Sequence, residues 1–393
     1  MGYYLFMPHS RSRIATRWIQ KLEGFWPSVG VTGLRQVGKT TLLREQMGIS
    51  NFVSFDDEDT RETAENSAKV FLAQLTPPVI IDEVQKVPKL FDAIKSKVDR
   101  GKRPGLYYLT GSSQFSAKLG IRESLTGRIG LIQLFPMILR ELNQVPDGKS
   151  CRDPLHQNPI PFKVEDVASA MNQGGMPVPA FLRDSSMLEM YWKSWLETIV
   201  YRDLTRVYGK GYDPEIAMDL LRQMGKLFAE GELPTSGHFR LHSRKLKLYF
   251  QAMETVFLIR RFRCHETGTG KDYWLLGDSG LVRHLMNSQL NPGGTLSLVR
   301  HFVLNEMIAR NEYAGVSLPQ SYFKSAKGKP VDFIWNNVPI KFVERIQSLG
   351  WEERALEGAM KKLGAPLGIL ACPSDSVNIP KKGIATVPWS YWS

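Results

Sequence analysis

The segment from residue 33 to residue 40 constrains the fold of this chain most strongly. It reads GLRQVGKT and matches the phosphate-binding pattern G-x-x-x-x-G-K-[ST]. A short apolar run, Val29 to Thr32, precedes it, and a helix-forming run begins at Thr41. The order strand, glycine-rich loop, helix is the one that such a loop requires. These residues therefore predict a loop that binds the phosphates of a nucleotide.

Each residue type in this loop has a physical role. Gly33 and Gly38 let the backbone bend so that its N–H groups and the helix N-terminus face an anion. Lys39 is expected to reach the β and γ phosphates, and Thr40 to offer its hydroxyl to Mg2+. The expected cofactors are therefore ATP and Mg2+. The predicted nucleotide-binding residues are Gly33, Arg35, Gln36, Val37, Gly38, Lys39, Thr40 and Thr41.

A second apolar run, Val79 to Ile81, ends in two acids, Asp82 and Glu83. Asp82 at the end of a buried strand is the expected outer partner of the metal, together with Thr40. Glu83 is then free to orient or deprotonate an attacking water. The pair favours a nucleotide hydrolase over a protein that only binds nucleotide, with Glu83 and Lys39 as catalytic residues.

Strand and helix patterns alternate along the first part of the chain. This alternation implies a parallel sheet with helices on both faces, so the predicted class is α/β with a five-stranded P-loop core. The expected strands are Val29 to Thr32, Phe52 to Phe55, Val79 to Ile81, Leu106 to Thr110 and Ile129 to Phe135.

Two further catalytic candidates lie in this part of the chain. The fourth strand ends in TGSS, where ring-forming ATPases place a polar sensor of the γ-phosphate and the attacking water; Ser112 is the first choice and Thr110 the second. A serine-rich turn is the alternative. Arg128 follows a helix-like run from Phe115 to Leu125 and could stabilise transition-state charge in a neighbouring subunit, or simply be solvated.

Motifs that follow one another along the chain carry a family resemblance. They are GLRQVGKTT from Gly33, FDD from Phe55, IIDEVQKVP from Ile80, LTGSS from Leu109, SLTGR from Ser124, GGMP from Gly174 and YRDL from Tyr201. With these motifs the chain resembles the AAA-type P-loop ATPases of bacteria and archaea that carry a C-terminal domain of unknown function with a restriction-endonuclease-like core. The resemblance covers nearly the whole chain and is dense up to about residue 205.

The resemblance implies four domains. They are a P-loop ATPase core at residues 1–145, a helical lid at 160–210, a winged-helix-like segment at 211–290 and a degenerate nuclease-like α/β domain at 291–393. Such ATPases tend to form rings, so self-association is expected, with a hexamer as one candidate. Arg202 could be a nucleotide sensor in the lid or form a salt bridge with Asp203. Asp56 and Asp57 could support the nucleotide site or form a turn at the strand end.

The net charge of +12 is concentrated in one segment, since residues 240–271 hold eight basic residues against Glu254 and Glu266. A helix is expected from Ser243 to Thr255, followed by strands from Val256 to Cys264 and from Tyr273 to Leu276. A helix and a basic hairpin can bind a groove and the phosphates of DNA, with salt-dependent affinity. A solvated basic surface is the alternative. The predicted DNA-binding residues are Arg240, Arg244, Lys245, Lys247, Arg260, Arg261, Arg263 and Lys271.

The last hundred residues contain only part of a nuclease site. Such a site needs carboxylates that converge on Mg2+ beside a lysine. Glu306, Asp332 and Lys341 supply these residue types, but Pro339 stands where the second strand should carry an acid. Proline cannot bind a metal, so we expect the fold without cleavage activity.

Composition agrees with a cytoplasmic protein. The chain has 393 residues, of which 42% are hydrophobic and 23% charged, enough for two or three domains with cores of their own. No run approaches the length of a membrane span, the N-terminus lacks the pattern of an export signal, and the three cysteines lack the spacing of a disulfide framework or a zinc site.

These patterns predict an Mg2+-dependent, oligomeric AAA-type ATPase that couples ATP hydrolysis to DNA binding and to remodelling or translocation, with branched DNA as one candidate substrate. The main alternative is a nucleotide-dependent regulatory switch that binds a protein partner, as in a defence or toxin–antitoxin-like module. A third hypothesis is an ATP-gated nuclease.

Overall fold

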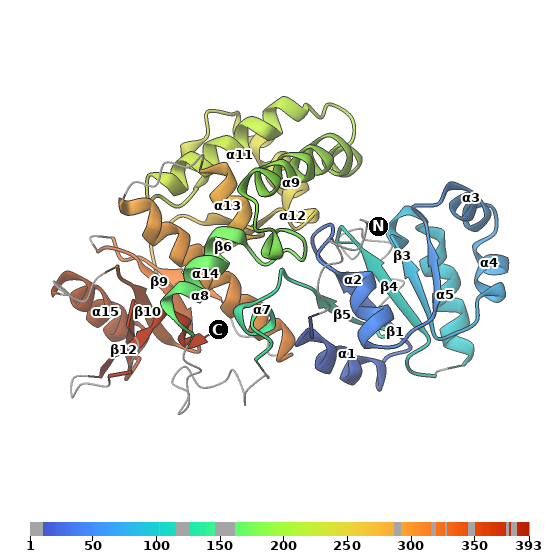
Figure 1. The fold of residues 1–393 in the computed structure, drawn as a ribbon, viewed down its shortest axis with the longest axis horizontal. Coiled ribbons are helices and arrows are strands. Elements are labelled where there is room, and N and C mark those ends of the chain that lie inside the picture. The colour runs from blue at the N-terminus through green and yellow to red at the C-terminus, as the bar shows by residue number, and fades with distance from the viewer. Residues whose placement is uncertain are drawn as a thin grey trace. The chain divides into compact units, whose positions relative to one another are not determined.

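The computed structural model divides the chain into two compact units (Figure 1). The first comprises Met1–Pro136 and Thr255–Phe257, and the second comprises Met137–Glu254 and Leu258–Ser393. The structure describes residues 11–101, 103–114, 126–145, 162–286, 292–315, 320–326, 328–344, 350–374, 377–378 and 383–392. The predicted helix-like run at residues 115–125 and most of the loop expected between the first two domains lie outside these residues.

The first unit is built on a five-stranded parallel sheet with the strand order β2-β3-β4-β1-β5. The predicted α/β class and the five predicted strands are confirmed, with each strand end within two residues of its predicted position. Because β4 lies between β1 and β3, the carboxyl ends of these three strands are neighbours at one edge of the sheet. The strands are β1 (Ser28–Thr32), β2 (Asn51–Ser54), β3 (Val79–Asp82), β4 (Tyr107–Gly111) and β5 (Ile129–Gln133).

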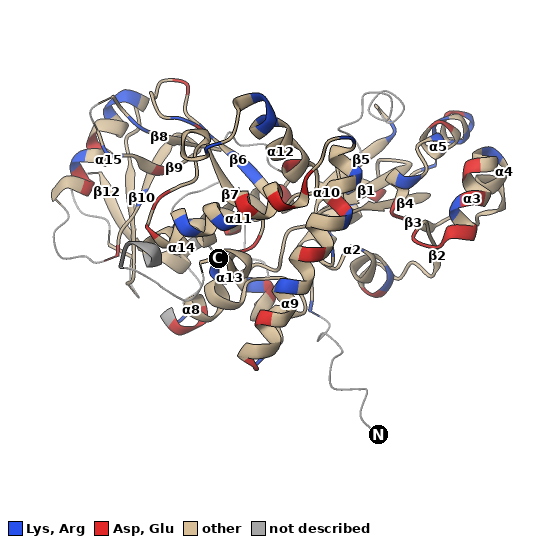
Figure 2. Cartoon of the chain, turned by 90° about the horizontal axis from the view of Figure 1, so that it is seen from above, with Lys and Arg blue, Asp and Glu red and all other residues tan. Residues whose placement is uncertain are grey.

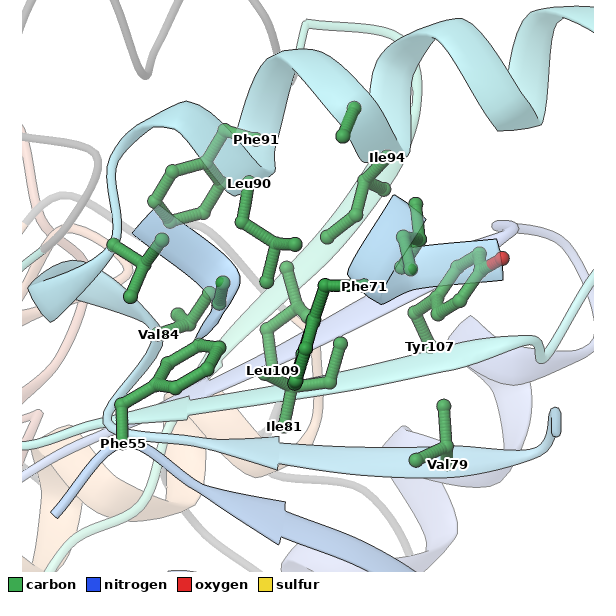
Figure 3. Packing of buried hydrophobic residues seen from close by; sticks show 14 of the residues in the cluster. Phe55, Phe71, Val79, Ile81, Val84, Leu90, Phe91, Ile94, Tyr107 and Leu109 are labelled. Carbon is green, nitrogen blue, oxygen red and sulfur yellow. The ribbon is translucent and has the colours of Figure 1, made fainter. Parts of the chain in front are cut away.

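Helices cover both faces of this sheet. On one face, α4 (Ala68–Gln74) and α5 (Lys89–Arg100) pack their apolar side chains against alternate residues of β3 and β4, as Figure 3 shows. On the other face lies α1 (Ala15–Glu23), where the Tyr108 hydroxyl donates to the Glu23 carboxylate. Burial of these side chains, at roughly 25 cal/mol per Å2 of apolar surface, holds the strand ends in place. The remaining elements are α2 (Lys39–Thr41), which continues as a π-helix (Leu42–Gln46), α3 (Glu58–Asn66) and a 3-10 turn (Val84–Lys86).

The second unit begins with helices. Trp192 and Trp195 on α9 (Ser185–Thr198) are both buried. The helices are α7 (Leu139–Leu142), α8 (Val164–Gln173), α9 (Ser185–Thr198) with a π-helical extension (Ile199–Asp203), α10 (Leu204–Tyr208), α11 (Pro214–Ala229), α12 (Ser243–Thr255), α13 (Ser279–Leu285), α14 (Pro292–Tyr313) and α15 (Gly350–Leu363). No helix among the described residues is both long and apolar enough to cross a lipid bilayer.

A seven-stranded mixed sheet completes the second unit, with the strand order β12-β11-β10-β9-β8-β6-β7. Strand β6 pairs antiparallel with β7 and parallel with β8, where Arg263 lies opposite Ser321. The sheet therefore continues across residue 290, where the sequence places a domain boundary, and the hairpin expected as a wing forms one edge of the larger sheet. The strands are β6 (Ile259–Cys264), β7 (Tyr273–Leu276), β8 (Ser321–Phe323), β9 (Val331–Trp335), β10 (Val338–Phe342), β11 (Gly368–Cys372) and β12 (Ile384–Pro388).

Candidate nucleotide-binding and hydrolysis site

The predicted phosphate loop connects the end of β1 to α2. Gly33 has φ +151°, and a Cβ at this position would collide with the carbonyl oxygen of Leu134. Gly38 has φ +97°, which favours glycine, and leads directly into α2. Close packing against the chain that follows β5 is thus a second reason for glycine at position 33, one that the motif alone does not reveal.

The Lys39 side chain is buried against the loop to which it belongs. Only 6% of the residue is exposed, and Nζ donates to the carbonyl oxygens of Gly33 at 3.0 Å and Leu34 at 2.8 Å. The carbonyl oxygen of Val37 in turn accepts from Nη1 of Arg13 at 3.0 Å. Arg13 also donates to the Phe135 carbonyl, so this arginine braces the loop, a role that the sequence did not indicate.

The remaining loop residues differ in exposure. Val37 is buried, Arg35 is half-buried, and Gln36 is exposed with φ +63°. Thr40 is half-buried and Thr41 is exposed at the start of the helix. The loop thus directs two apolar side chains inward, Leu34 and Val37, and leaves polar groups at its surface.

Asp82 collects three hydroxyl donors at the carboxyl edge of the sheet. Thr40 donates to Oδ1 at 3.1 Å, Ser54 donates to Oδ2 at 3.2 Å, and Thr110 also donates to Oδ1. The structure therefore brings together Thr40 and Asp82, the two residues predicted to hold the metal. A hydroxyl and a carboxylate oxygen side by side suit Mg2+, which takes oxygen ligands and usually keeps waters and substrate phosphates as its other ligands.

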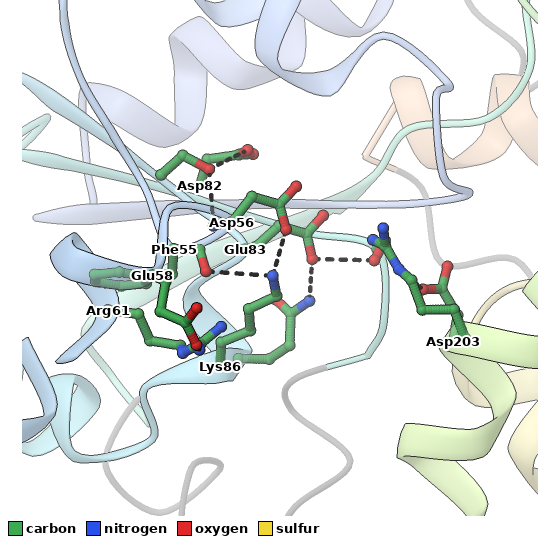
Figure 4. Close-up of polar contacts among 12 residues, drawn as sticks. Phe55, Asp56, Glu58, Arg61, Asp82, Glu83, Lys86 and Asp203 are labelled. Atoms are coloured by element: carbon green, nitrogen blue, oxygen red, sulfur yellow. Dashed lines mark hydrogen bonds and ion pairs between the residues drawn. The ribbon is translucent and has the colours of Figure 1, made fainter. Parts of the chain in front are cut away.

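Glu83 lies next to this group in a left-handed conformation, with φ +53° and 8% exposure. Its Oε2 accepts from the Ser112 hydroxyl at 3.1 Å and from the Gln85 side-chain amide (Figure 4). Ser112 and Thr110, the two sensor candidates, thus contact different acids: Ser112 contacts Glu83 and Thr110 contacts Asp82. The contacts of Ser54 and Gln85 were missed, since no motif in the sequence assigns them a partner.

The acids after β2 stabilise local structure. Asp57 caps α3 by accepting from the backbone N–H of Thr60 at 2.9 Å, and these hydrogen bonds from Thr60 lower the pKa of Asp57. Asp56 pairs with the Lys86 ammonium, which also donates to the Phe55 carbonyl at 3.2 Å (Figure 4). In the second unit, Arg202 donates to the Asp203 carboxylate at 3.2 Å, which is the salt bridge considered from the sequence.

Arg128 lies at the amino ends of the parallel strands, whereas the phosphate loop follows the carboxyl end of β1. It precedes β5, which runs parallel to β1 with Ile129 opposite Ser28. A five-residue strand is about 16 Å long, so this guanidinium is far from the loop of its own subunit. It forms a bidentate pair with Asp99, at 2.7 and 2.9 Å, and this hydrogen bonding raises the pKa of Arg128.

The predicted DNA-binding residues lie on or next to α12 and β6, both of which carry basic positions in Figure 2. Arg261 is bound by Asp272 at 2.6 Å and lies over the Trp274 ring. Arg260 is half-buried, and burial lowers its pKa to about 10. Lys245 is half-buried as well. The remaining residues of the set are exposed, as is Arg261: they are Arg240, Arg244, Lys247, Arg263 and Lys271.

Of the residues considered for a nuclease centre, Asp332 and Lys341 are in contact, whereas Glu306 accepts a hydrogen bond from a different part of the chain. The Asp332 carboxylate, 3% exposed, accepts from Lys341 Nζ at 3.0 Å and from the Phe342 N–H at 2.8 Å, and it pairs with Arg300 at 3.1 Å. Glu306 instead accepts from the backbone N–H of Leu139 at 3.0 Å. Two cations already neutralise the buried Asp332, so these residues do not fit a catalytic metal ion.

Fold and site together define a class of protein. The chain is an α/β protein with a five-stranded parallel sheet, in which the phosphate loop follows β1 and the acid pair follows β3, and with a second, mixed sheet. This arrangement is consistent with a P-loop core of the AAA type. Residues 26–143 match the family model described as an AAA domain.

Individual relatives are distant. Uncharacterized proteins of Mycobacterium tuberculosis and Mycobacterium bovis are each 26% identical over 272 residues, covering 66% of this chain and 56% of theirs. The chain thus spans about half the length of these relatives. A Walker-type ATPase of Pyrococcus abyssi is 14% identical with a TM-score of 0.43, covering 72% of this chain and 96% of that one. The Aeropyrum pernix Orc1 protein in complex with DNA is 13% identical with a TM-score of 0.27, covering 79% and 96%.

Proposed function

We propose that the first unit binds ATP with Mg2+ and hydrolyses it to ADP and phosphate. The observation that carries this proposal is the pairing of Thr40 with Asp82 directly beside a buried Glu83. Thr40 and Asp82 would hold Mg2+, which when bound neutralises charge on the phosphates. Lys39 lies on the phosphate loop and can exchange its two carbonyl partners for phosphate oxygens.

The carboxylate of Glu83 supplies the base. It accepts a proton from a water whose oxygen attacks the γ-phosphorus, while the bond between that phosphorus and the bridging oxygen of ADP breaks. The Ser112 hydroxyl holds Oε2 of Glu83, so the carboxylate is oriented before the reaction. The arrangement supports hydrolysis rather than passive binding because Asp82 suffices, with Thr40, to hold Mg2+. Glu83, the next residue, is then available to act as the base.

We further propose that subunits associate through the surface at the amino ends of the first sheet, where Arg128 lies. An arginine about 16 Å from the phosphate loop of its own subunit can act only on a nucleotide held by a neighbouring subunit. A ring, with a hexamer as one candidate, satisfies this requirement for every subunit. The Asp99 partner must release Arg128 on assembly, which would link hydrolysis to oligomerisation.

DNA is the proposed partner of the second unit. Six exposed basic side chains on and around α12 and the β6–β7 hairpin can contact phosphates, and such contacts release counterions, so affinity should fall with salt. ATP hydrolysis would then drive remodelling of DNA or movement along it, with branched DNA as one candidate substrate. The occupied Asp332 cluster gives no support to a nuclease role.

The test is ATP turnover by the purified protein alone and with single-stranded, duplex and four-way-junction DNA, at low and moderate salt, with Lys39→Ala as the inactive control. We expect turnover that DNA stimulates and salt weakens. Turnover that no DNA alters would favour a regulatory switch that binds a protein partner. Absence of turnover under every condition would contradict the proposed ATPase.

A further inference from the structure

Gln85 contacts the proposed base directly. It belongs to the 3-10 turn that follows Glu83, and its Nε2 donates to Oε2 of Glu83, the same oxygen that accepts from Ser112 (Figure 4). The opposite amide orientation would place Oε1 against a carboxylate, so the chemistry of the contact sets the orientation. The Glu83 carboxylate thus accepts hydrogen bonds from two neutral donors, Gln85 in the turn after β3 and Ser112 directly after β4.

The other end of this amide has no partner. Gln85 Oε1 is buried and accepts no hydrogen bond from any described residue. Buried acceptors without a donor are uncommon in folded proteins and often mark functional positions or sites for water. A group at this position that served only the fold would be expected to bond at both ends.

Gln46 provides the comparison within the same unit. It is also half-buried, and both ends of its amide form hydrogen bonds: Oε1 accepts from the Arg13 N–H at 2.9 Å and from Thr16 Oγ1 at 3.1 Å, while Nε2 donates to the Arg11 carbonyl at 2.6 Å. Gln46 therefore joins parts of the chain together. Gln85 instead makes a single bond, and that bond is to the proposed base.

We propose that Gln85 is a positioning residue for hydrolysis, holding the Glu83 carboxylate with Ser112 so that its other oxygen remains for the attacking water. This inference rests on the proposed ATPase function. Glu83 itself has a sparsely populated left-handed backbone conformation, and its buried carboxylate is held by hydrogen bonds from Ser112 and Gln85. Gln85 supplies one of these two donors from the turn that follows β3.

The test uses Gln85→Met, which keeps the length of the side chain and removes the donor, with Gln46→Met as the matched control. For Gln85→Met we expect kcat to fall roughly ten- to a hundredfold while the Kd for ATP and the thermal midpoint stay close to those of the wild type. Gln46→Met should lower the thermal midpoint and leave kcat per folded molecule unchanged.

A double variant separates positioning from general damage. In a Glu83→Gln background, Gln85→Met should lower the residual turnover no further, because the group that it orients is already absent. If Gln85→Met does not fold, Gln85→Glu serves instead: it keeps the side-chain length, sets a like charge against Glu83, and should reduce kcat at least as much.

Several outcomes would overturn the inference. Unchanged kcat in both Gln85 variants would do so, and increased kcat would show that the amide restrains Glu83 rather than positioning it. An equal loss in the presence and absence of the Glu83 carboxylate would indicate damage to the fold. A wild-type protein that binds ATP without hydrolysing it would contradict the proposed function itself, whereas a hydrolysing wild type with an indifferent Gln85 would contradict only this assignment.

Discussion

Lys39 and Glu83 are both buried, and the structure gives them different tasks. Lys39 lies on the phosphate loop, so Lys39→Ala should abolish nucleotide binding. Glu83→Gln should keep ATP affinity near that of the wild type and reduce turnover by about a hundredfold or more, because an amide cannot accept the proton of the water. Binding of a fluorescent ATP analogue and steady-state phosphate release measure the two effects. Normal turnover in Glu83→Gln would refute the assignment of the base.

Two buried titratable groups in the second unit respond oppositely to acid. His301 contacts the Leu276 carbonyl at 2.7 Å, and burial lowers its pKa to about 4. His301 is therefore protonated near pH 6.5 in the unfolded chain but stays neutral in the native protein. The free energy of unfolding falls as the pH falls from 6.5 towards 4. Burial raises the pKa of Asp278 from 3.8 to about 6, against the backbone N–H groups that it accepts. The native state then holds the extra proton, and this contribution grows as the pH falls below 6.

These signs give a stability prediction between pH 7 and pH 5. Over this range His301 should cost about 2 kcal/mol of unfolding free energy, and Asp278 should offset about 1 kcal/mol. Asp278→Asn should therefore make the loss of stability in acid steeper, and His301→Gln should make it shallower. Urea unfolding at pH 5, 6 and 7 measures the slopes for the three proteins. Identical slopes would mean that neither group has a pKa in the native state that differs from its pKa in the unfolded chain.

At the scale of elements, the parallel sheet determines what Arg128 can reach. Because β1 and β5 run parallel, this residue lies at their amino ends and the phosphate loop lies at the carboxyl end of β1. Arg128→Ala should therefore lower hydrolysis by about a hundredfold or more without lowering ATP affinity. Asp99→Ala, which removes the competing partner, should not lower hydrolysis. Turnover per subunit should fall on dilution; equal turnover in a dilute monomer would exclude action between subunits.

The elements also show where prediction from sequence succeeds. The strands of the first sheet are short apolar runs between polar turns, so local pattern locates them, and the phosphate loop and acid pair are contiguous motifs. The pairing of β6 with β8 is different, because Arg263 and Ser321 meet across a long stretch of chain. The hydrogen bonds from Gln85 and Ser112 to Glu83 form around a left-handed backbone conformation of Glu83 that no local sequence pattern reveals. The sequence led us to expect no cleavage at Asp332 because proline replaces an acid, but its two cationic partners could be found only from the fold.

At the scale of the whole molecule, net charge and its placement give a prediction about DNA. Arg244 and Lys247 lie three residues apart on α12 and are both exposed. Replacing both by glutamine should weaken DNA binding of every sequence alike and reduce the slope of log affinity against log salt by roughly two. Lys226→Gln, an exposed lysine on α11, is the control and should change affinity little. Fluorescence anisotropy at several salt concentrations measures the slope, and an unchanged slope would favour the protein-binding alternative.

The joining of β6 to β8 has a mechanical consequence. A free wing can swing on its own hinge and adapt to whatever it meets, whereas these two strands share their hydrogen bonds with a platform of five others. A load applied to the arginines of β6 would pass along the ladder to the C-terminal strands instead of being absorbed by a flexible arm. Removing the chain after residue 290 would accordingly leave the side of β6 that pairs with β8 without hydrogen-bond partners. Such an unpaired strand edge promotes aggregation.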